Sequence, residues 1–319
     1  MNHVLSGIHH VTAICGDPQR NIDFYAGLLG LRFVKRTVNF DDPAAYHLYF
    51  GDGEGNPGSI VTFFAWPGAP RGRVGRGQLT AMALAAPSGS LGYWMRRLER
   101  ANVAVETEHR FGEPLIRFHD PDGMPVEIIA TDTIEGHPAW SLAGVPDDVA
   151  IRLVHGVTAT IGSLDESGAM YEADLGFSEF GQEGRRRRFA ADQGGAGAFI
   201  DVVEGAGDAP GRIAVGQIHH VAWRTPSDAE EVAWREHLLR RGRSVTPIMD
   251  RQYFRSIYFH EPGGVLFEIA TDPPGFARDE PEQSLGTRLM LPPWLEPLRG
   301  RIEESLPPIH LPALVRAER

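Results

Sequence analysis

One short motif occurs twice in this sequence, more than two hundred residues apart. GIHHVTAICGD stands at residues 7–17, and GQIHHVAWRTP stands at residues 216–226. A single histidine in an apolar strand is most often a hydrogen-bonded core residue. Two copies of a rare His-His pair in matching apolar surroundings indicate instead a duplicated unit and a task that both copies share.

A second repeat extends this duplication to the whole chain. FHDPDGMPVEIIATD begins at residue 118 and FHEPGGVLFEIATD begins at residue 259, and both are typical of hairpins. Each hairpin follows an amphipathic stretch, residues 90–103 and 227–242, the second with Ser227 as N-cap and Gly242 as C-cap. The same order recurs twice more, so four strand–helix–strand–strand–strand units begin near residues 7, 77, 153 and 217.

These four units predict the fold class. A βαβββ unit alone has an open sheet edge and an uncovered face, so it needs a partner. We therefore expect an α+β fold in which four βαβββ modules pair into cup-shaped mixed sheets. Residues 1–134 are expected to hold modules 1 and 2, 135–150 a Gly/Pro-rich linker, 151–272 modules 3 and 4, and 273–319 a Pro-rich C-terminal tail with a short helix near 294–306.

Composition excludes several classes of protein. The net charge of −11 argues against a nucleic-acid partner, and 42% hydrophobic with 23% charged residues is ordinary for a globular chain. The N-terminus lacks a signal-peptide pattern, no apolar run is long enough to span a membrane, and one cysteine allows no internal disulfide. We expect a cytoplasmic protein, and the open sheet edges make a homodimer a reasonable expectation.

Aligning the modules shows which of them carry metal-binding side chains. At the positions of the second histidine and of the last-strand carboxylate, the modules have His10 and Thr62, Thr80 and Glu127, Gly156 and Asp201, and His220 and Glu268. If modules 1 and 4 share one cup, it holds His10, His220 and Glu268. Two imidazoles and one carboxylate form the facial triad that suits Fe(II) and leaves coordination positions open. The other cup would then be a duplicate without ligands.

The sequence leaves two local questions open. Side chains alternate across a strand, so only one histidine of each pair is expected to point into the cup, and periodicity does not decide which one. The run RRRR at residues 185–188 lies in an expected strand between acidic residues, and it is interpreted as a solvated hairpin face.

The chain also resembles a known family, the ring-cleaving extradiol dioxygenases of the vicinal oxygen chelate (glyoxalase/bleomycin resistance/dioxygenase) superfamily, hydroquinone 1,2-dioxygenase type. The motifs that carry the resemblance span nearly the whole chain: GIHHVTAICGD (7–17), RFVKRTVNFDDPAAYHLYFGDGEGNPG (32–58), QIHHVAW (217–223), DRQYFRSIYFHEPGGVLFEIATD (250–272) and DEPEQSLGTRLMLPP (279–293).

The resemblance implies a function and a set of site residues. It implies that His10, His220 and Glu268 bind Fe(II), or Mn(II) in its place, and that the enzyme opens the ring of a small aromatic substrate with O₂, as in aromatic hydrocarbon catabolism. The pocket residues it implies are His9 and Thr12 at the substrate, with His219, Arg251 and Tyr258 in catalysis. His219 is the candidate acid–base because histidine titrates near the working pH.

Three other functions remain compatible with the same fold. A catechol extradiol dioxygenase would use the same triad. A glyoxalase-like metal lyase or isomerase would ordinarily use four protein ligands, two from each module, and module 1 has no acid near residue 62. A non-catalytic ligand-binding protein would have no need of the triad. Fold alone does not decide among these functions.

Overall fold

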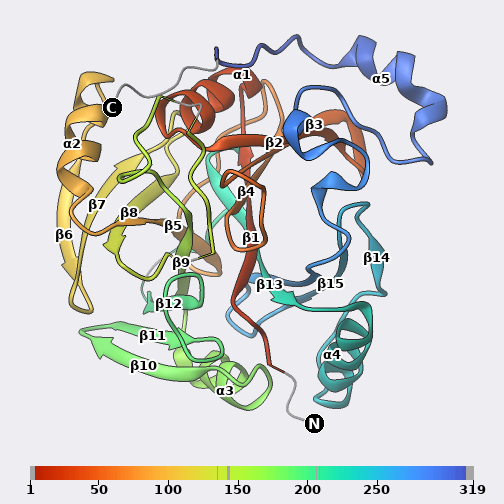
Figure 1. The fold of residues 1–319 in the computed structure, drawn as a ribbon. Helices are drawn as coiled ribbons and strands as arrows, with labels where there is room; N and C mark the ends of the chain where they lie inside the picture. Colours follow the sequence, from red (N-terminus) through yellow and green to blue (C-terminus); the bar gives the residue numbers. More distant parts are fainter. Residues whose placement is uncertain (1–3, 135, 142–143, 206, 208, 314–319) are drawn as a thin grey trace.

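The computed structural model describes residues 4–134, 136–141, 144–205, 207 and 209–313, and Figure 1 shows its fold. The four expected βαβββ modules follow one another along the chain. Module 1 comprises β1 (Ile8–Cys15), α1 (Pro18–Ile22), the π-helical segment η1 (Asp23–Leu28), β2 (Arg32–Asn39), β3 (Asp42–Gly51) and β4 (Ile60–Ala65). Module 2 comprises β5 (Gln78–Pro87), α2 (Leu91–Arg100), β6 (Glu106–Arg110), β7 (Glu113–His119) and β8 (Pro125–Thr131).

The second half of the chain repeats this plan. Module 3 comprises β9 (Leu153–Ile161), α3 (Leu164–Ala173), β10 (Ser178–Glu183), β11 (Arg186–Ala190) and β12 (Phe199–Glu204). Module 4 comprises β13 (Gln217–Thr225), α4 (Asp228–Arg240), β14 (Met249–Asp250), β15 (Arg255–His260) and β16 (Leu266–Thr271). Ser227 caps α4 by accepting a hydrogen bond from the backbone N–H of Glu230, and Gly242 follows the helix with a φ of 79°, as the sequence predicts.

The modules pair in a way that joins distant parts of the sequence. One eight-stranded sheet has the order β14-β15-β16-β13-β1-β4-β3-β2, which unites modules 4 and 1. The other has the order β10-β11-β12-β9-β5-β8-β7-β6, which unites modules 3 and 2. In each sheet the two modules meet through their first strands, which run antiparallel. The α+β class and the pairing of modules 1 and 4 are therefore confirmed. The division into two sequence-contiguous halves stays a prediction.

The two faces of each sheet differ in chemistry. One continuous set of buried apolar side chains includes Val11 and Phe63 from the first sheet and Met82 and Val157 from the second. Because side chains alternate along a strand, the neighbours of these residues face the inside of each cup. The main apolar core therefore lies between the sheets and around their helices, and the cups hold polar side chains together with smaller apolar clusters.

The C-terminal tail packs along module 1. Its described part contains the 3-10 segments η2 (Phe276–Arg278), η3 (Glu282–Ser284) and η4 (Glu296–Leu298), and the helix α5 (Arg299–Ser305), close to where a helix is expected. Lys35 on β2 is fully buried, and its Nζ lies 2.7 Å from a carboxylate oxygen of Asp279 and 2.6 Å from one of Glu280. This buried ion pair fixes the tail to β2.

The expected linker and tail are described only in part. The expected linker, 135–150, includes residues 135, 142 and 143, and the expected tail includes residues 314–319; these positions lie outside the described residues. Within the described part of the chain, no helix combines the length and the apolar character needed to cross a membrane.

Candidate metal centre

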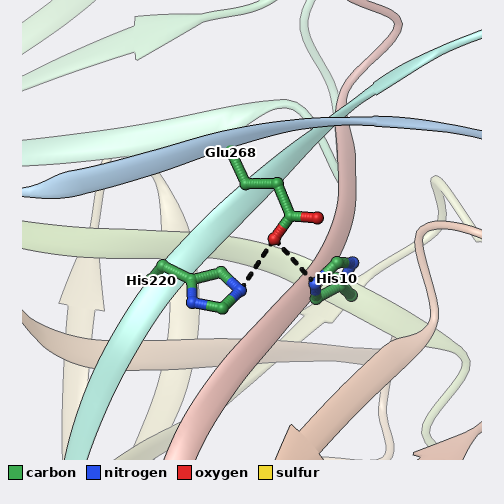
Figure 2. A group of neighbouring side chains, drawn as sticks. All are labelled: His10, His220 and Glu268. Carbon is green, nitrogen blue, oxygen red and sulfur yellow. Dashed lines mark ion pairs between the residues drawn. The ribbon is translucent and has the colours of Figure 1, made fainter. Parts of the chain in front are cut away.

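Three side chains from three strands converge inside the first cup. His10 lies on β1, His220 on the neighbouring β13 and Glu268 on β16, beyond β13 (Figure 2). Oε2 of Glu268 lies 3.3 Å from Nε2 of His10 and 2.8 Å from Nε2 of His220. Their exposed fractions are 2%, 4% and 0%. Among the described residues, this is the group of three found with donor atoms within 4.8 Å of one another.

Both His-His pairs lie on β-bulges. In the pairing of β1 with β13, His9 is an extra residue between Ile8 and His10, and His219 is an extra residue between Ile218 and His220. A bulge interrupts the strict alternation of side chains. As a result both rings of each pair lie together: Nδ1 of His9 is 2.9 Å from Nδ1 of His10, and the equivalent distance for His219 and His220 is 2.8 Å.

These contacts correct, for the second pair only, the expectation that one histidine of each pair can reach the cup: His219 and His220 both line the cavity in this cup, whereas His9 does not. They also fix the tautomers. A neutral imidazole has one N–H, so if Nε2 of His220 binds a metal, its Nδ1 donates to Nδ1 of His219. His219 then carries its own proton on Nε2. The first histidine of each pair therefore orients the second, and the same reasoning holds for His9 and His10.

The donor set fits a divalent metal ion. Oε2 of Glu268 and Nε2 of His220 are buried and have no aligned hydrogen-bond partner among the described residues, although they lie close together. Adjacent ligands of an octahedral ion with bonds of about 2.1 Å lie roughly 3 Å apart, as these atoms do. The other oxygen, Oε1, accepts a hydrogen bond from Ser256 Oγ, which orients the carboxylate. Donor atoms whose lone pairs converge on one point are what a cation needs.

The protonation states agree with this interpretation. Burial opposes ionisation of Glu268, but the neighbouring rings of His10 and His220 outweigh it and hold the pKa of Glu268 well below its usual range. Burial lowers the pKa of His220, and burial and His10 together lower the pKa of His9 well below its usual value. Two neutral imidazoles and one carboxylate would leave a divalent ion with one net positive charge.

A cavity of about 360 Å³ opens on the three candidate ligands. Its apolar wall consists of Phe40, Tyr49, Phe64, Trp66, Phe254 and Leu266. Its polar wall consists of Thr12, Asn39, Asp41, His47, His219, Arg251 and Tyr258. The size and the aromatic lining suit a single planar ring.

The structure places four of the five expected pocket residues in this cavity. Thr12, His219, Arg251 and Tyr258 line it. His9 lies behind the cavity wall, against the rings of His10 and Phe254, and is not among the lining residues that the structure describes.

The environment of His219 differs from what the sequence argument assumes. Burial and the adjacent His220 lower the pKa of His219 to about 3. The ring is therefore neutral at pH 7, and the premise that it titrates near the working pH does not hold. With its proton on Nε2, it is a hydrogen-bond donor.

Arg251 and Tyr258 form one unit beside the candidate ligands, because Tyr258 is the cross-strand neighbour of Glu268. Arg251 Nε donates to the Tyr258 hydroxyl over 3.1 Å, and its Nη1 lies 3.1 Å from a carboxylate oxygen of Asp41. Burial raises the pKa of Tyr258 far above its usual range, so the phenol stays protonated. The unit therefore offers the cavity one fixed positive charge and one hydroxyl donor.

The sequence analysis did not assign the other nine residues that line the cavity, among them His47, Tyr49 and Phe254. His47 and Tyr49 are two residues apart on β3, between the core residues Tyr46, Leu48 and Phe50, so alternation within AYHLYF could have placed them in the cup. For Phe254, which packs on the rings of His9 and His10, no sequence signal points to the site.

The second cup has the same strand register but different side chains. Thr158 pairs with Ala81 across β9 and β5, as Thr12 pairs with His220 across β1 and β13. The equivalent of His220 is therefore Ala81, and the prediction of Thr80 was wrong by one residue. Thr80 is instead the equivalent of His219, because each is the extra residue of the same bulge in its sheet.

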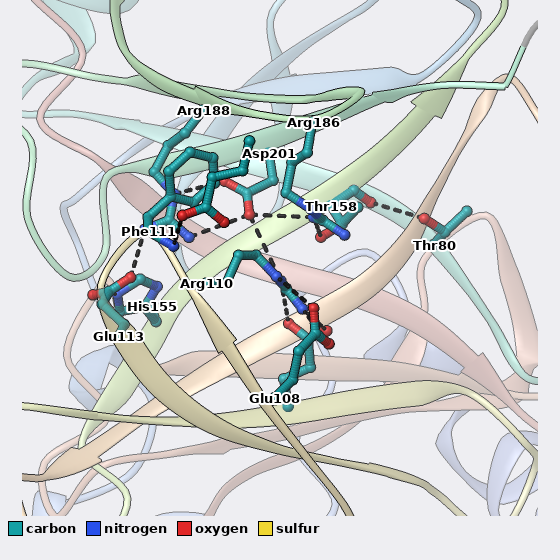
Figure 3. Close-up of polar contacts among 12 residues, drawn as sticks. Thr80, Glu108, Arg110, Phe111, Glu113, His155, Thr158, Arg186, Arg188 and Asp201 are labelled. Atoms are coloured by element: carbon teal, nitrogen blue, oxygen red, sulfur yellow. Dashed lines mark hydrogen bonds and ion pairs between the residues drawn. The ribbon is translucent and has the colours of Figure 1, made fainter.

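Buried ion pairs fill this second cup (Figure 3). Arg110 donates to both oxygens of Glu127 over 3.0 and 2.8 Å, and Arg188 donates to both oxygens of Asp201 over 2.7 and 3.2 Å. Arg186 Nη1 reaches Asp201 as well, at 3.2 Å. Only 2% of Arg188 is exposed, so the interpretation of RRRR as a solvated face was wrong for Arg186 and Arg188.

The second cup also contains a histidine that the sequence comparison overlooked. His155 is the extra residue of a bulge in β9, the position equivalent to His9, and its Nε2 lies 2.9 Å from Oε1 of Glu113. It faces a carboxylate instead of a second histidine, because residue 156 is glycine. A side chain there would place its Cβ 2.8 Å from the carbonyl oxygen of Phe199.

Comparison with known proteins identifies the family. The model of the Glyoxalase/Bleomycin resistance protein/Dioxygenase superfamily matches residues 7–128 and 153–269. The chain belongs to this superfamily. The first matched segment corresponds to modules 1 and 2 and the second to modules 3 and 4, so each match covers two of the four modules.

Three similar proteins narrow this assignment. The chain is 44% identical to "Putative ring-cleaving dioxygenase MhqO" of Bacillus subtilis (strain 168) over 96% of its own length and 97% of that protein. It is 35% identical to "Chlorohydroquinone/hydroquinone 1,2-dioxygenase" of Sphingobium indicum over 95% of its length and 96% of that protein. A crystal structure described as a "putative dioxygenase" from Bacillus subtilis superposes with a TM-score of 0.94, at 44% identity over 98% of this chain and 100% of that one. The chain is thus an enzyme of the oxygenase class, as the resemblance implies.

Proposed function

We propose that the protein is an Fe(II)-dependent dioxygenase that uses O₂ to open the aromatic ring of a hydroquinone-type substrate. The observation that carries this proposal is the set of His10, His220 and Glu268 at the floor of an aromatic-lined cavity. The relative named as a chlorohydroquinone/hydroquinone dioxygenase supports the substrate class.

Fe(II) is the metal that we expect at this centre, with Mn(II) as the alternative. Two histidines and one carboxylate with open positions are typical of non-haem iron oxygenases. Bound there, the metal would supply the positive charge that favours a phenolate and the redox chemistry that joins O₂ to an electron-rich ring.

The cavity residues would then bind and orient the substrate. Phe64, Trp66 and Phe254 offer flat apolar surfaces to the ring and exclude water from it. The N–H on Nε2 of His219 can donate to an oxygen that gains negative charge beside the metal. The guanidinium of Arg251 and the hydroxyl of Tyr258 can stabilise a negatively charged oxygen near them.

The number of ligands argues against a glyoxalase-like lyase. Thr62 lies beside Thr12 on β4 in the register position that Glu268 occupies beside Ala222 on β16. A symmetric four-ligand site would need a carboxylate at residue 62. Among the described residues the metal-binding group has three members, which leaves more positions for substrate and O₂.

The test is O₂ uptake by anaerobically iron-loaded protein with hydroquinone, methylhydroquinone and catechol supplied in parallel. We expect uptake with a hydroquinone, with loss of its ultraviolet band and incorporation of both atoms of ¹⁸O₂ into the product. Uptake with catechol alone would keep the dioxygenase and replace the substrate. Iron-loaded protein that consumes no O₂ with any of the three would contradict the proposal.

A cytoplasmic location and a homodimer stay predictions from the sequence.

A further inference from the structure

A chain of four hydrogen-bonded side chains runs through the wall of the cavity. The Tyr49 hydroxyl lies 2.8 Å from Nδ1 of His47, and Nε2 of His47 lies 2.5 Å from Oγ1 of Thr62. Thr62 Oγ1 donates to Oγ1 of Thr12 over 3.2 Å. We call these four residues the wall chain. It ends at Thr12, two residues from the candidate ligand His10 on the same strand.

The sheet register explains how these side chains meet. Thr12 on β1 pairs with Thr62 on β4, and Thr62 pairs with Tyr49 on β3, so the three lie in one row across the cup. His47 is two residues from Tyr49 and lies on the same face. Thr12, His47 and Tyr49 line the cavity, and Thr12 and Thr62 are both fully buried.

The hydrogen bonds of the wall chain all run in one direction from donor to acceptor, from Tyr49 to Thr12. Burial lowers the pKa of His47 well below its usual value, so the ring is neutral and carries one N–H. Thr62 uses its single hydroxyl hydrogen on Thr12, so it must accept from Nε2–H of His47. Nδ1 of His47 then has no hydrogen and accepts from the Tyr49 hydroxyl.

This direction determines what Thr12 can do. Its hydroxyl oxygen already accepts from Thr62, and its own hydrogen is not used within the wall chain. That hydrogen is therefore available to an acceptor in the cavity.

We propose that the wall chain holds Thr12 as a hydrogen-bond donor to an oxygen of the phenolic substrate, with His47 as the positioning residue that sets its direction. The inference rests on the proposed function, because it needs a substrate with an oxygen in this cavity. Contact of Thr12 with the substrate is what the family resemblance implies; the new assignment is that of His47, Tyr49 and Thr62, which would act on the substrate only through Thr12. A donor at this place favours rings that present an ionised or carbonyl-like oxygen to it.

The test is a double-mutant cycle on KM for hydroquinone, measured by O₂ uptake of iron-loaded protein. Thr12→Val and His47→Leu should each raise KM by about twofold to tenfold, the value of one hydrogen bond, with little change in kcat. The double variant should be no worse than Thr12→Val alone, because both changes remove the same interaction. His47→Gln, whose amide N–H can donate to Thr62, should recover part of the loss.

A second pair of variants keeps the test decisive if His47→Leu folds poorly. Tyr49→Phe removes only the donor to His47, so it should raise KM slightly in the wild-type background and not at all in Thr12→Val. Iron content should stay the same in every variant.

The inference would be overturned if the effects on KM were additive in the double variants, or if His47→Leu lost its iron. In either case, turnover of hydroquinone by the wild-type protein would leave the proposed function intact. A wild-type protein that turns over no dihydroxybenzene would overturn both.

Discussion

The two cups have the same topology and nearly the same strand register, but one converges on a candidate metal centre and the other on ion pairs. In the first, His10, His220 and Glu268 direct lone pairs at one point. In the second, the equivalent carboxylate, Glu127, is bound by the guanidinium of Arg110. A cation would satisfy the buried carboxylate in both cases. One cup would take it from solution, and the other supplies it from its own chain.

A single register position illustrates this difference. Counting along the strands from Glu268 and from Glu127 makes Arg251 equivalent to Arg110. Arg251 pairs with Asp41 and Tyr258 at the cavity wall, whereas Arg110 pairs with Glu127 inside the cup. The same residue type at the same position thus lines a cavity in the first cup and forms a buried ion pair in the second.

The largest expected effect comes from removing a ligand. His220→Ala or Glu268→Ala should abolish metal binding and lower turnover below detection, because two ligands seldom retain a catalytic ion. Inductively coupled plasma mass spectrometry and O₂ uptake measure the two quantities. The matched control is Glu127→Gln in the second cup, which should keep both metal and turnover. Loss of metal in this control, with the fold intact by circular dichroism, would remove the distinction between the cups.

The next effect concerns stability. Arg110→Ala leaves Glu127 buried without its partner, so the free energy of unfolding should fall by about 3–5 kcal/mol, the usual cost of breaking a buried pair. Arg251→Ala, at the equivalent position with an exposed partner, should change it by less than about 1 kcal/mol. Urea denaturation measures both. The effect on activity should be the reverse. Arg251→Ala should lower kcat/KM per mole of folded protein, whereas Arg110→Ala should leave it unchanged. Equal destabilisation by the two changes would contradict the comparison.

A smaller effect should follow from the hydrogen bond behind the carboxylate. Ser256 donates to Glu268, and its register equivalent in the second cup is Leu115. Ser256→Ala should weaken metal binding about 10- to 100-fold, because a partner that orients a ligand is lost. Competition with a chelator of known affinity measures this change, and unaltered affinity would show that the carboxylate needs no orientation.

The smallest effect is a pH dependence confined to the second cup. Burial alone would raise the pKa of Glu113, but His155 and Arg188 outweigh it and hold the pKa at about 2. A carboxyl with a depressed pKa in the folded state stabilises the fold above its unfolded pKa, about 4.3, and this contribution is lost as the pH falls toward 2. Glu113→Gln should therefore narrow the difference in Tm between pH 6 and pH 3. An unchanged difference would mean that Glu113 is not part of the ion-pair network.

Much of this comparison could be predicted from the sequence. The repeated His-His motif and the repeated hairpin set the module boundaries, and aligning the modules placed Glu127 and Glu268 at equivalent positions. The pairing of modules 1 and 4 followed from asking which modules together provide a complete ligand set. These features depend on periodicity and on repeats, which a sequence displays directly.

The rest depends on features that a sequence does not display. A β-bulge adds a residue without a fixed signature, so the contact of His9 with His10 could not be predicted. The burial of Arg188 depends on Asp201 and on Glu113, which lies on a strand from another module. Four consecutive arginines suggest a solvated face until their partners are known.

The most direct test of the account is the metal stoichiometry of the purified chain after anaerobic Fe(II) loading, for wild type, His220→Ala and Glu127→Gln. The account predicts one iron per chain in wild type and in Glu127→Gln, and none in His220→Ala. Two irons per chain in wild type, or iron retained in His220→Ala, would contradict the claim that only the cup of modules 1 and 4 forms the metal centre.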